Sequence, residues 1–282
     1  MQINNAFISD LREYLSKQGH SPIADFTPTG FSIGGIVQLA CLKAASPQWL
    51  GVMLEVWRKS SKVLDDAIQS YETGRFPSTS NMWDVRGLEF FPIRGRDWAD
   101  KIKYHPFESR FCKAAKQAGF GNKAEALAGA LFEMADNVAQ HSGADSTMPA
   151  PGLIGYYICD GHVAFTIADL GRGVFDSLKE NPHWHQLQNS KEALMAIIQN
   201  HASRRPYGGD GEGFKEVFRS LSNLNGLIEL FSGDGRVRIT STLSGREATP
   251  QFSGLLSGFQ ISVNCSLAGN PSEKTFPIDY LT

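Results

Sequence analysis

Two apolar, strand-like segments on either side of a tight turn constrain the fold of this chain more than any other feature. The segments run from Gly152 to Cys159 and from His162 to Ala168, and the dipeptide Asp160-Gly161 lies between them. Asp-Gly between two such runs is a strong short-range signal for a two-residue β-hairpin. The middle of the chain is therefore predicted to contain antiparallel strands.

Further strand signals follow this hairpin. Leu227 to Ser232 and Arg236 to Thr240 surround Gly233-Asp234-Gly235, which predicts a second hairpin, and Phe259 to Ser266 alternates as a final strand. Hairpins predominate over strand–helix–strand crossovers, which argues against a doubly wound fold. We predict an α+β fold in which helices cover one face of a largely antiparallel mixed sheet.

The first hundred residues have mainly helical signals and carry no recognisable chemistry. Ser46-Pro47, a cap followed by a proline at the first helical position, predicts a long helix from Gln48 to Ser70. This helix either packs into the core or serves for dimerisation or partner docking. A second helix is expected from Pro106 to about Gly119.

A third helix is predicted to begin at about Lys123, because Asn122 and Glu125 have the spacing of a capping box. It extends to His141. Its buried stripe is formed by apolar residues spaced three and four apart, namely Leu127, Leu131, Met134 and Val138.

Composition indicates an ordinary globular protein. Hydrophobic residues make up 41% of the 282 residues and charged residues 20%. The net charge of −2 leaves no electrostatic footprint for nucleic acid or an anionic membrane. The four cysteines are far apart, and the N-terminus does not have the pattern of a secretory signal. We therefore expect a cytoplasmic protein.

Three short motifs carry the chemistry, and the first lies on the helix that begins near Lys123. Glu133, Asn137 and His141 are each four residues apart, so they share one stripe of that helix. A carboxylate can accept a proton from water, and an amide oxygen is a hard ligand suited to Mg²⁺. Taken alone, this row is also typical of a solvated helix face.

The second motif is Asp169-Leu-Gly171-Arg-Gly173, directly after the apolar strand. An aspartate at a strand end can accept a hydrogen bond from an exocyclic amine such as that of adenine. The glycines that follow allow the backbone to approach a flat ring closely. An ordinary turn has the same composition.

The third motif contains Gly209, Gly211 and Gly213 and is followed by Phe214 and Lys215. Glycines at a helix start expose unpaired N–H groups and the positive end of the helix dipole, which suits phosphate. A flexible loop with a glycine cap is the alternative.

The order of these motifs resembles that of the GHKL superfamily of ATPases and kinases, which includes gyrase, the heat-shock chaperone, histidine kinases and the mismatch-repair ATPases. The resemblance extends from about Pro106 to Leu267. The first motif resembles the N-box, Glu-x-x-x-Asn. The second and third resemble the G1 and G2 boxes. The hairpin between the first two motifs also matches, so the resemblance implies a Bergerat-type α/β sandwich.

The resemblance implies a role for each motif. Asn137 would coordinate the Mg²⁺ of Mg-ATP, Asp169 would bind the adenine amine, and Glu133 would be the general base. Further nucleotide contacts would come from the residues of the G1 and G2 boxes: Gly171, Gly173, Gly209, Gly211, Gly213, Phe214 and Lys215.

The resemblance also implies an ATP lid from Val174 to Tyr207. A helix from Lys191 to His201, capped by Ser190, is expected inside it, and Arg204-Arg205 follows this helix. Superfamily kinases often carry Gly-Thr at the start of the last strand, where this chain has Gly258-Phe259.

The chain is thus divided into three parts by the sequence. Residues 1–104 form a mainly helical N-terminal region of unknown role, 105–269 an ATP-binding domain like that of histidine kinases, and 270–282 a C-terminal tail. His20 and His105 are the only histidines of the first part. Neither lies in a phosphoacceptor motif, so a sensor histidine kinase is disfavoured.

We expect a Mg²⁺-dependent ATP-binding protein that hydrolyses ATP slowly and uses its lid as a switch for a partner, or for a homodimer formed through the N-terminal region. A protein serine kinase of the anti-sigma-factor type uses the same residues. A non-hydrolysing module in which ATP controls partner binding is the third reading.

Overall fold

The fold is known from a computed structural model, which describes residues 2–16, 28–45, 48–75, 87–95, 98–99, 101–143, 150–204, 224–242, 245–268 and 272–277. The predicted α+β class is confirmed: helices pack on an antiparallel five-stranded sheet. Its strand order is β3-β4-β5-β7-β6. The strands are β3 (Leu88–Ile93), β4 (Gly152–Cys159), β5 (His162–Asp169), β6 (Asn225–Thr242) and β7 (Gly245–Ser266).

The predicted hairpin at Asp160-Gly161 is confirmed. Cys159 pairs with His162 in the register of β4 and β5, and Gly161 has a φ of 66°. Glycine adopts this left-handed conformation without the steric cost that a side chain brings.

The second predicted hairpin is wrong. The two segments on either side of Gly233-Asp234-Gly235 form a single strand, β6, which pairs with β7 from Asn225 to Thr242. The glycine-rich stretch is a β-bulge, with register shifts between Ser232 and Gly233 and between Gly233 and Gly235. Because turns and bulges both use glycine at positive φ, composition alone did not separate them.

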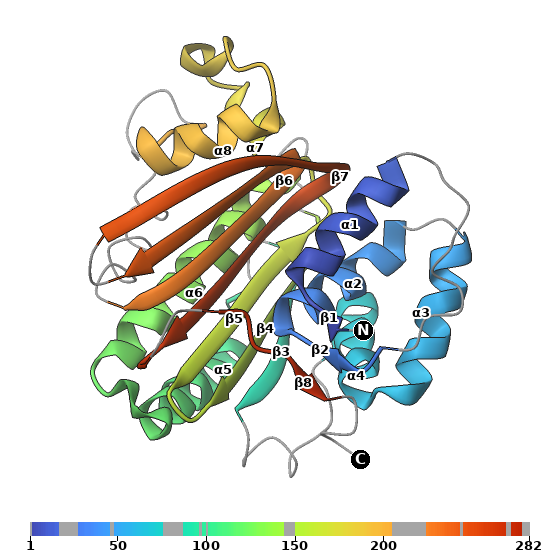
Figure 1. The fold of residues 1–282 in the computed structure, drawn as a ribbon, viewed down its shortest axis with the longest axis vertical. Coiled ribbons are helices and arrows are strands. Elements are labelled where there is room, and N and C mark those ends of the chain that lie inside the picture. Colours follow the sequence, from blue (N-terminus) through green and yellow to red (C-terminus); the bar gives the residue numbers. More distant parts are fainter. Residues whose placement is uncertain are drawn as a thin grey trace.

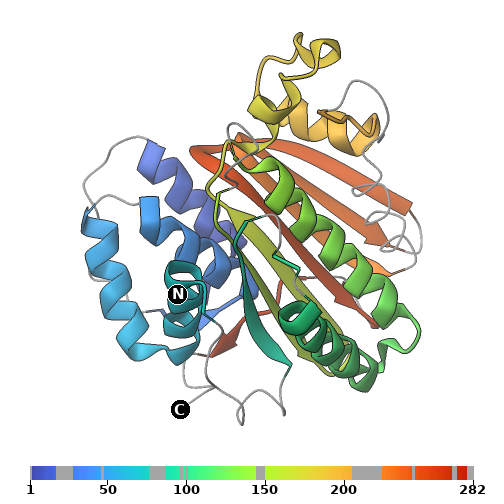
Figure 2. The same cartoon turned by 180° about the vertical axis from the view of Figure 1, so that it is seen from behind.

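Helices cover both faces of the sheet, which corrects the expectation of one covered face (Figures 1 and 2). On one face lie α5 (Lys101–Ala115), the π-helical turn η2 (Lys116–Phe120) and α6 (Lys123–His141). On the other face lie α1 (Asn5–Ser16), α2 (Ile33–Ala45), α3 (Gln48–Ser60) and α4 (Lys62–Thr73), which we call the N-terminal layer. The central strands β4 and β5 are buried along almost their whole length. Their side chains on both faces of the sheet must therefore be packed against other elements.

The single long helix expected from Gln48 to Ser70 is interrupted at Ser61. Ser61 has an extended backbone (φ −137°, ψ 106°), and its hydroxyl accepts a hydrogen bond from the N–H of Leu64 at 3.4 Å. This side chain caps α4 and so ends α3. The proposed starting cap, Ser46-Pro47, lies outside the described residues.

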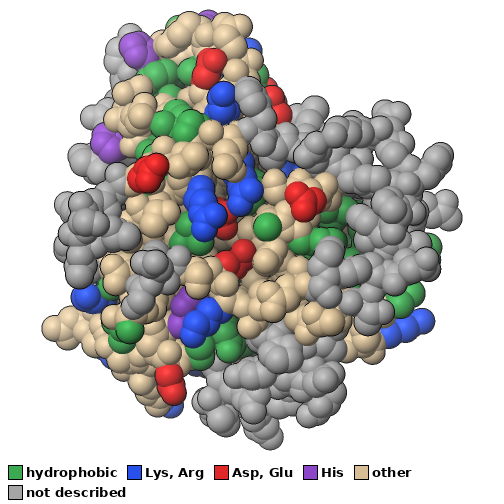
Figure 3. All heavy atoms as spheres, in the orientation of Figure 1, with side chains coloured by type: hydrophobic (Ala, Val, Ile, Leu, Met, Phe, Trp, Pro, Cys, Tyr) green, Lys and Arg blue, Asp and Glu red, His purple; other side chains and the backbone are tan. Residues whose placement is uncertain are grey.

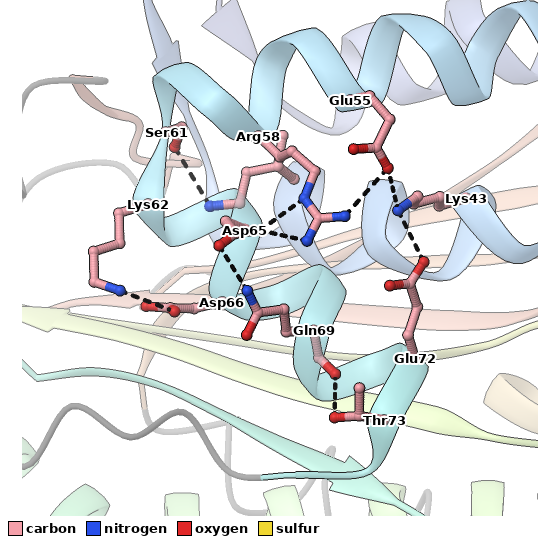
Figure 4. A network of polar contacts seen from close by, with 11 residues as sticks. Lys43, Glu55, Arg58, Ser61, Lys62, Asp65, Asp66, Gln69, Glu72 and Thr73 are labelled. Carbon is pink, nitrogen blue, oxygen red and sulfur yellow. Dashed lines mark hydrogen bonds and ion pairs between the residues drawn. The ribbon is translucent and has the colours of Figure 1, made fainter.

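Ion pairs hold the helices of the N-terminal layer together (Figure 4). Lys43 of α2 reaches Glu55 of α3 at 2.5 Å and Glu72 of α4 at 2.9 Å. Arg58 pairs with Asp65 at 2.6 Å across the break between α3 and α4. Ion pairs therefore join the helices of the N-terminal layer to one another, and the layer also packs against the sheet.

Of the two predicted helices on the opposite face, α6 starts where the sequence predicts and α5 starts earlier. α6 begins at Lys123 as predicted, although the side chain of Asn122 makes no capping hydrogen bond. Glu125 pairs instead with Lys116 at 2.5 Å. α5 begins at Lys101, so Pro106 lies inside it rather than at its start.

The two ends of the chain meet in a small second sheet. It contains β1 (Gln2–Ile3), β2 (Gly30–Phe31) and β8 (Phe276–Pro277), in the order β1-β2-β8. β3 belongs to the segment 1–104 yet pairs with β4, so this segment contributes an edge strand to the main sheet. Among the described residues, no helix has the length and apolar character needed to cross a membrane.

Candidate functional site

Asp169 is the last residue of β5, and it is buried, with 3% of the residue exposed. Its Oδ1 accepts a hydrogen bond from the backbone N–H of Gly171 at 2.6 Å. Burial raises the pKa of this carboxyl from 3.8 to about 7, although backbone hydrogen bonds from Gly171 and Phe259 act in the opposite direction. Asp169 is thus a buried hydrogen-bond acceptor, and its backbone hydrogen bonds do not fully offset the cost of burying the ionised carboxylate.

Two glycines allow the backbone to close around this carboxyl. A Cβ atom at Gly171 would lie 2.1 Å from the carbonyl oxygen of Ser142. A Cβ atom at Gly258 would lie 2.0 Å from the carbonyl oxygen of Asp169, and Gly258 also has a φ of 97°. A side chain at either position would collide with backbone, so both positions require glycine.

The first motif lies on α6, which packs against β5. Its apolar stripe is buried as predicted, whereas Glu133 and Asn137 are half-buried. The side-chain nitrogen of Asn137 is buried and has no hydrogen-bond partner among the described residues. Asp136 accepts a hydrogen bond from the indole N–H of Trp98 at 3.3 Å.

Arg172 joins the first two motifs. Its backbone N–H donates to the carbonyl of Ser142 at 3.0 Å, and its Nε donates to the carbonyl of His141 at 2.9 Å. Its side chain also pairs with Glu180. The C-terminal end of α6 is thereby held against the loop that follows Asp169, so the first two motifs meet at His141.

The predicted lid begins with α7 (Gly173–Leu178), the 3₁₀ turn η3 (Pro182–Trp184) and α8 (Ser190–Gln199). These elements lie over β6 and β7, at one edge of the sheet (Figure 1). The cap of α8 is Asn189, whose side chain accepts from the N–H of Glu192 at 2.9 Å, and not Ser190 as predicted. Arg204 pairs with Glu180 at 3.3 Å.

The third motif cannot be placed in this site. Gly209, Gly211, Gly213, Phe214 and Lys215 all lie outside the described residues, as does Arg205 of the predicted arginine pair.

Residues of β6 and β7 surround Asp169 on the side of the sheet away from β4. Phe259 stands opposite Asp169 in the register of β5 and β7, and its backbone hydrogen-bonds to the Asp169 carboxyl. Ser232 of β6 stands on the other side of Phe259, and its hydroxyl donates to the carbonyl of Gly258 at 3.2 Å. The Asp169 carboxyl therefore receives a backbone hydrogen bond at the position where the sequence has Gly258-Phe259.

The residues present are suited to Mg²⁺ held together with a phosphate. Asn137 offers a side-chain amide oxygen, and Glu133, one helical turn earlier, adds a carboxylate. Hard oxygen donors of this kind, completed by phosphate oxygens and water, are what Mg²⁺ prefers. The unpaired buried atom of Asn137 is its side-chain nitrogen, a donor suited to a phosphate oxygen rather than to a metal ion.

Neither a scan against models of protein families nor a search of curated proteins found a match for this chain.

Three residues of this site were not identified from the sequence. Arg172 occupies a variable position of its motif, Ser232 precedes a stretch interpreted as a turn, and Phe259 contributes through its backbone. The serine just before Gly233-Asp234-Gly235 was the one available signal, because a bulge re-aims the side chain beside it.

Proposed function

We propose that this chain binds ATP with Mg²⁺, hydrolyses it slowly, and uses the segment after Gly173 as a lid that switches a partner. The fold would then be of the Bergerat type, with a histidine-kinase-like ATPase domain, in a cytoplasmic protein. The observation that carries the proposal is the buried carboxyl of Asp169 at the end of β5, joined through Arg172 to the helix of Glu133 and Asn137.

Asp169 is suited to reading adenine. Its carboxyl already accepts the N–H of Gly171, and the exocyclic amine of adenine could donate to the remaining acceptor sites. A donor placed there lowers the cost of the buried charge. Guanine carries a carbonyl oxygen at the corresponding ring position, and this oxygen would repel the carboxylate.

The α6 residues are suited to the phosphate end of the nucleotide. Asn137 would hold the metal ion, which offsets phosphate charge. Glu133, on the same stripe of α6, would orient a water molecule and accept its proton during attack on the γ-phosphate.

Release of phosphate from ATP tests this role of Glu133. Glu133→Ala is expected to reduce turnover by roughly 100-fold or more, the range of a general base, while ATP affinity stays within about threefold. Glu125→Ala is the matched control, because Glu125 lies on the same helix and is exposed. Undiminished turnover in Glu133→Ala would remove Glu133 from the mechanism.

The same assay with γ-labelled ATP distinguishes hydrolysis from phosphate transfer. Label that appears as free phosphate supports the ATPase. Label on the serine of a co-purified protein supports the kinase of the anti-sigma-factor type. Tight ATP binding with neither product supports a non-hydrolysing module.

A further inference from the structure

The β-bulge of β6 contacts both helices of the lid. The hydroxyl of Ser232 accepts a hydrogen bond from the N–H of Val174, in the first turn of α7, at 2.8 Å. The carboxylate of Asp234 accepts from the N–H of Ser190, the first residue of α8, at 3.2 Å. These N–H groups have no partner inside their own helices, so the bulge caps both helices in trans.

The bulge also contacts the N-terminal layer. The guanidinium of Arg12, on α1, donates to the carbonyl of Gly233 at 2.9 Å. Gly235 lies directly under α8, since a Cβ atom there would be 2.6 Å from the backbone nitrogen of Lys191. Residues 232–235, which we call the bulge junction, therefore touch α7, α1 and α8 within four consecutive positions.

The bulge junction lies beside the candidate nucleotide site. Asp169 pairs with Phe259, and Phe259 pairs with Ser232, so the three residues form one row across β5, β7 and β6. The hydroxyl of Ser232 also donates to the carbonyl of Gly258, whose Cα lies against Asp169. A displacement of the junction would reach Asp169 through a single strand.

Arg12 is a buried cation, with 2% of the residue exposed. Its guanidinium lies 5.4 Å from the centre of the Phe231 ring, and that of Arg236 lies 5.2 Å from the same ring. Arg236 pairs in turn with Glu229 at 2.5 Å. Basic and acidic side chains also lie next to one another near the middle of the face in Figure 3. A buried guanidinium is costly unless its donors are used, and the carbonyl of Gly233 accepts from one of the donors of Arg12.

The start of α1 is held by contacts with α3, with Glu273 and with Glu229 of β6. The ring of Phe7 packs against Trp57 of α3, with 6.2 Å between ring centres. The backbone N–H of Asn5 donates to Glu273 at 3.0 Å. Arg12, more than one turn further along α1, extends to the bulge junction.

We propose that the bulge junction couples the lid to helix α1, so that closing the lid on nucleotide changes the N-terminal layer. A bulge determines which side chain points to which face of the strand. Moving it by one residue would take Ser232 away from Val174 and the Gly233 carbonyl away from Arg12 in the same step. This gives two arrangements that both the lid and α1 can favour, which is what coupling requires. The choice of nucleotide as effector rests on the proposed function, whereas the mechanical link does not.

Hydrogen exchange in the nucleotide-free protein tests the link by itself. Arg12→Met should increase exchange in peptides from 173–178 and 188–192 by roughly threefold or more, because their capping acceptors move. Arg58→Met is the matched control in the N-terminal layer, and it should leave both peptides unchanged. Unchanged lid exchange in a folded Arg12→Met protein would overturn the proposal.

A second variant, placed in the bulge junction, keeps the proposal testable if Arg12→Met does not fold. Gly235→Ala pushes on the start of α8 and is expected to increase exchange in the peptide from 5–16, which it does not touch. If exchange increases only in 188–192, the junction does not transmit and the proposal is wrong.

Addition of Mg-ATP separates this proposal from the proposed function. Protection of 5–16 by ATP in the wild type, lost in Ser232→Ala, supports both. A lid response to Arg12→Met without any ATP effect supports the link and contradicts the ATP assignment. ATP binding with no effect of Arg12→Met on the lid contradicts the link alone.

Discussion

At the residue scale, the buried carboxyl of Asp169 makes stability depend on pH. Its pKa is about 7 in the folded protein, against 3.8 as the ordinary value. Between these values the folded state binds more protons than the unfolded state, so the free energy of unfolding decreases as pH rises. Glu273, whose pKa burial raises from 4.5 to about 7, acts in the same direction.

Asp169→Asn is expected to reduce this pH dependence. One such group contributes at most about 1.4 kcal/mol per pH unit. Relative to the wild type, the variant should gain stability above pH 7 and show little change near pH 4. Urea denaturation at intervals between pH 4 and 8 measures it, with Asp160→Asn at the exposed hairpin turn as the control. An identical slope in wild type and Asp169→Asn would contradict the buried, proton-binding carboxyl.

Replacement of glycine by alanine is expected to have opposite effects on stability at Gly258 and at Gly51. Gly258 has a φ of 97° and no room for a Cβ atom, so Gly258→Ala should destabilise by about 2 kcal/mol or more. Gly51 lies within α3 with open space around it, so Gly51→Ala should stabilise by about 0.5–1 kcal/mol. Urea denaturation of the two variants gives both values. A tolerated alanine at Gly258 would show that the backbone around Asp169 can relax.

At the element scale, short local patterns predicted where a helix starts and where a tight turn lies. They did not predict whether a helix or a strand continues without a break. The start of α6 at Lys123 and the turn at Gly161 follow from nearby residues. The break at Ser61 was missed because serine is acceptable both within a helix and as a cap. Gly233-Asp234-Gly235 was misread because only the long partner strand β7 reveals a bulge.

The break at Ser61 can be tested directly. Ser61→Ala removes the side chain that caps α4 and should cost about 1 kcal/mol of stability. Ser60→Ala, one position earlier and exposed, should change the free energy of unfolding by less than about 0.5 kcal/mol. Thermal and urea denaturation should agree. Equal effects of the two substitutions would mean that the end of α3 does not depend on this cap.

At the scale of the whole molecule, the sequence contained a signal for a doubly covered sheet. The segments Gly152–Cys159 and His162–Asp169 are apolar almost throughout, whereas a strand with one solvated face alternates. Which elements supply the second cover was not predictable, because Asn5 and Glu273 meet across 268 residues of sequence. Contacts between such distant residues leave no local pattern.

The candidate site likewise contains residues that the sequence could single out and residues that it could not. Asp169 and Asn137 could be singled out because side-chain chemistry distinguishes them in a motif, and their roles stay predictions. The backbone contacts of Phe259 and Ser142 were not, because any residue type can make them. The domain boundaries and the roles of all three motifs stay predictions.

Calorimetric titration with Mg-ATP is the most direct test of the central claim, that Asp169 reads adenine. The wild type and Asp160→Asn should bind ATP with micromolar or tighter affinity and GTP at least about 100-fold more weakly, the discrimination expected when a buried acceptor is left unpaired. Asp169→Asn should lose at least about tenfold in ATP affinity, since it removes a charge-assisted hydrogen bond. Equal affinity for ATP and GTP, or an unchanged affinity in Asp169→Asn, would contradict the account.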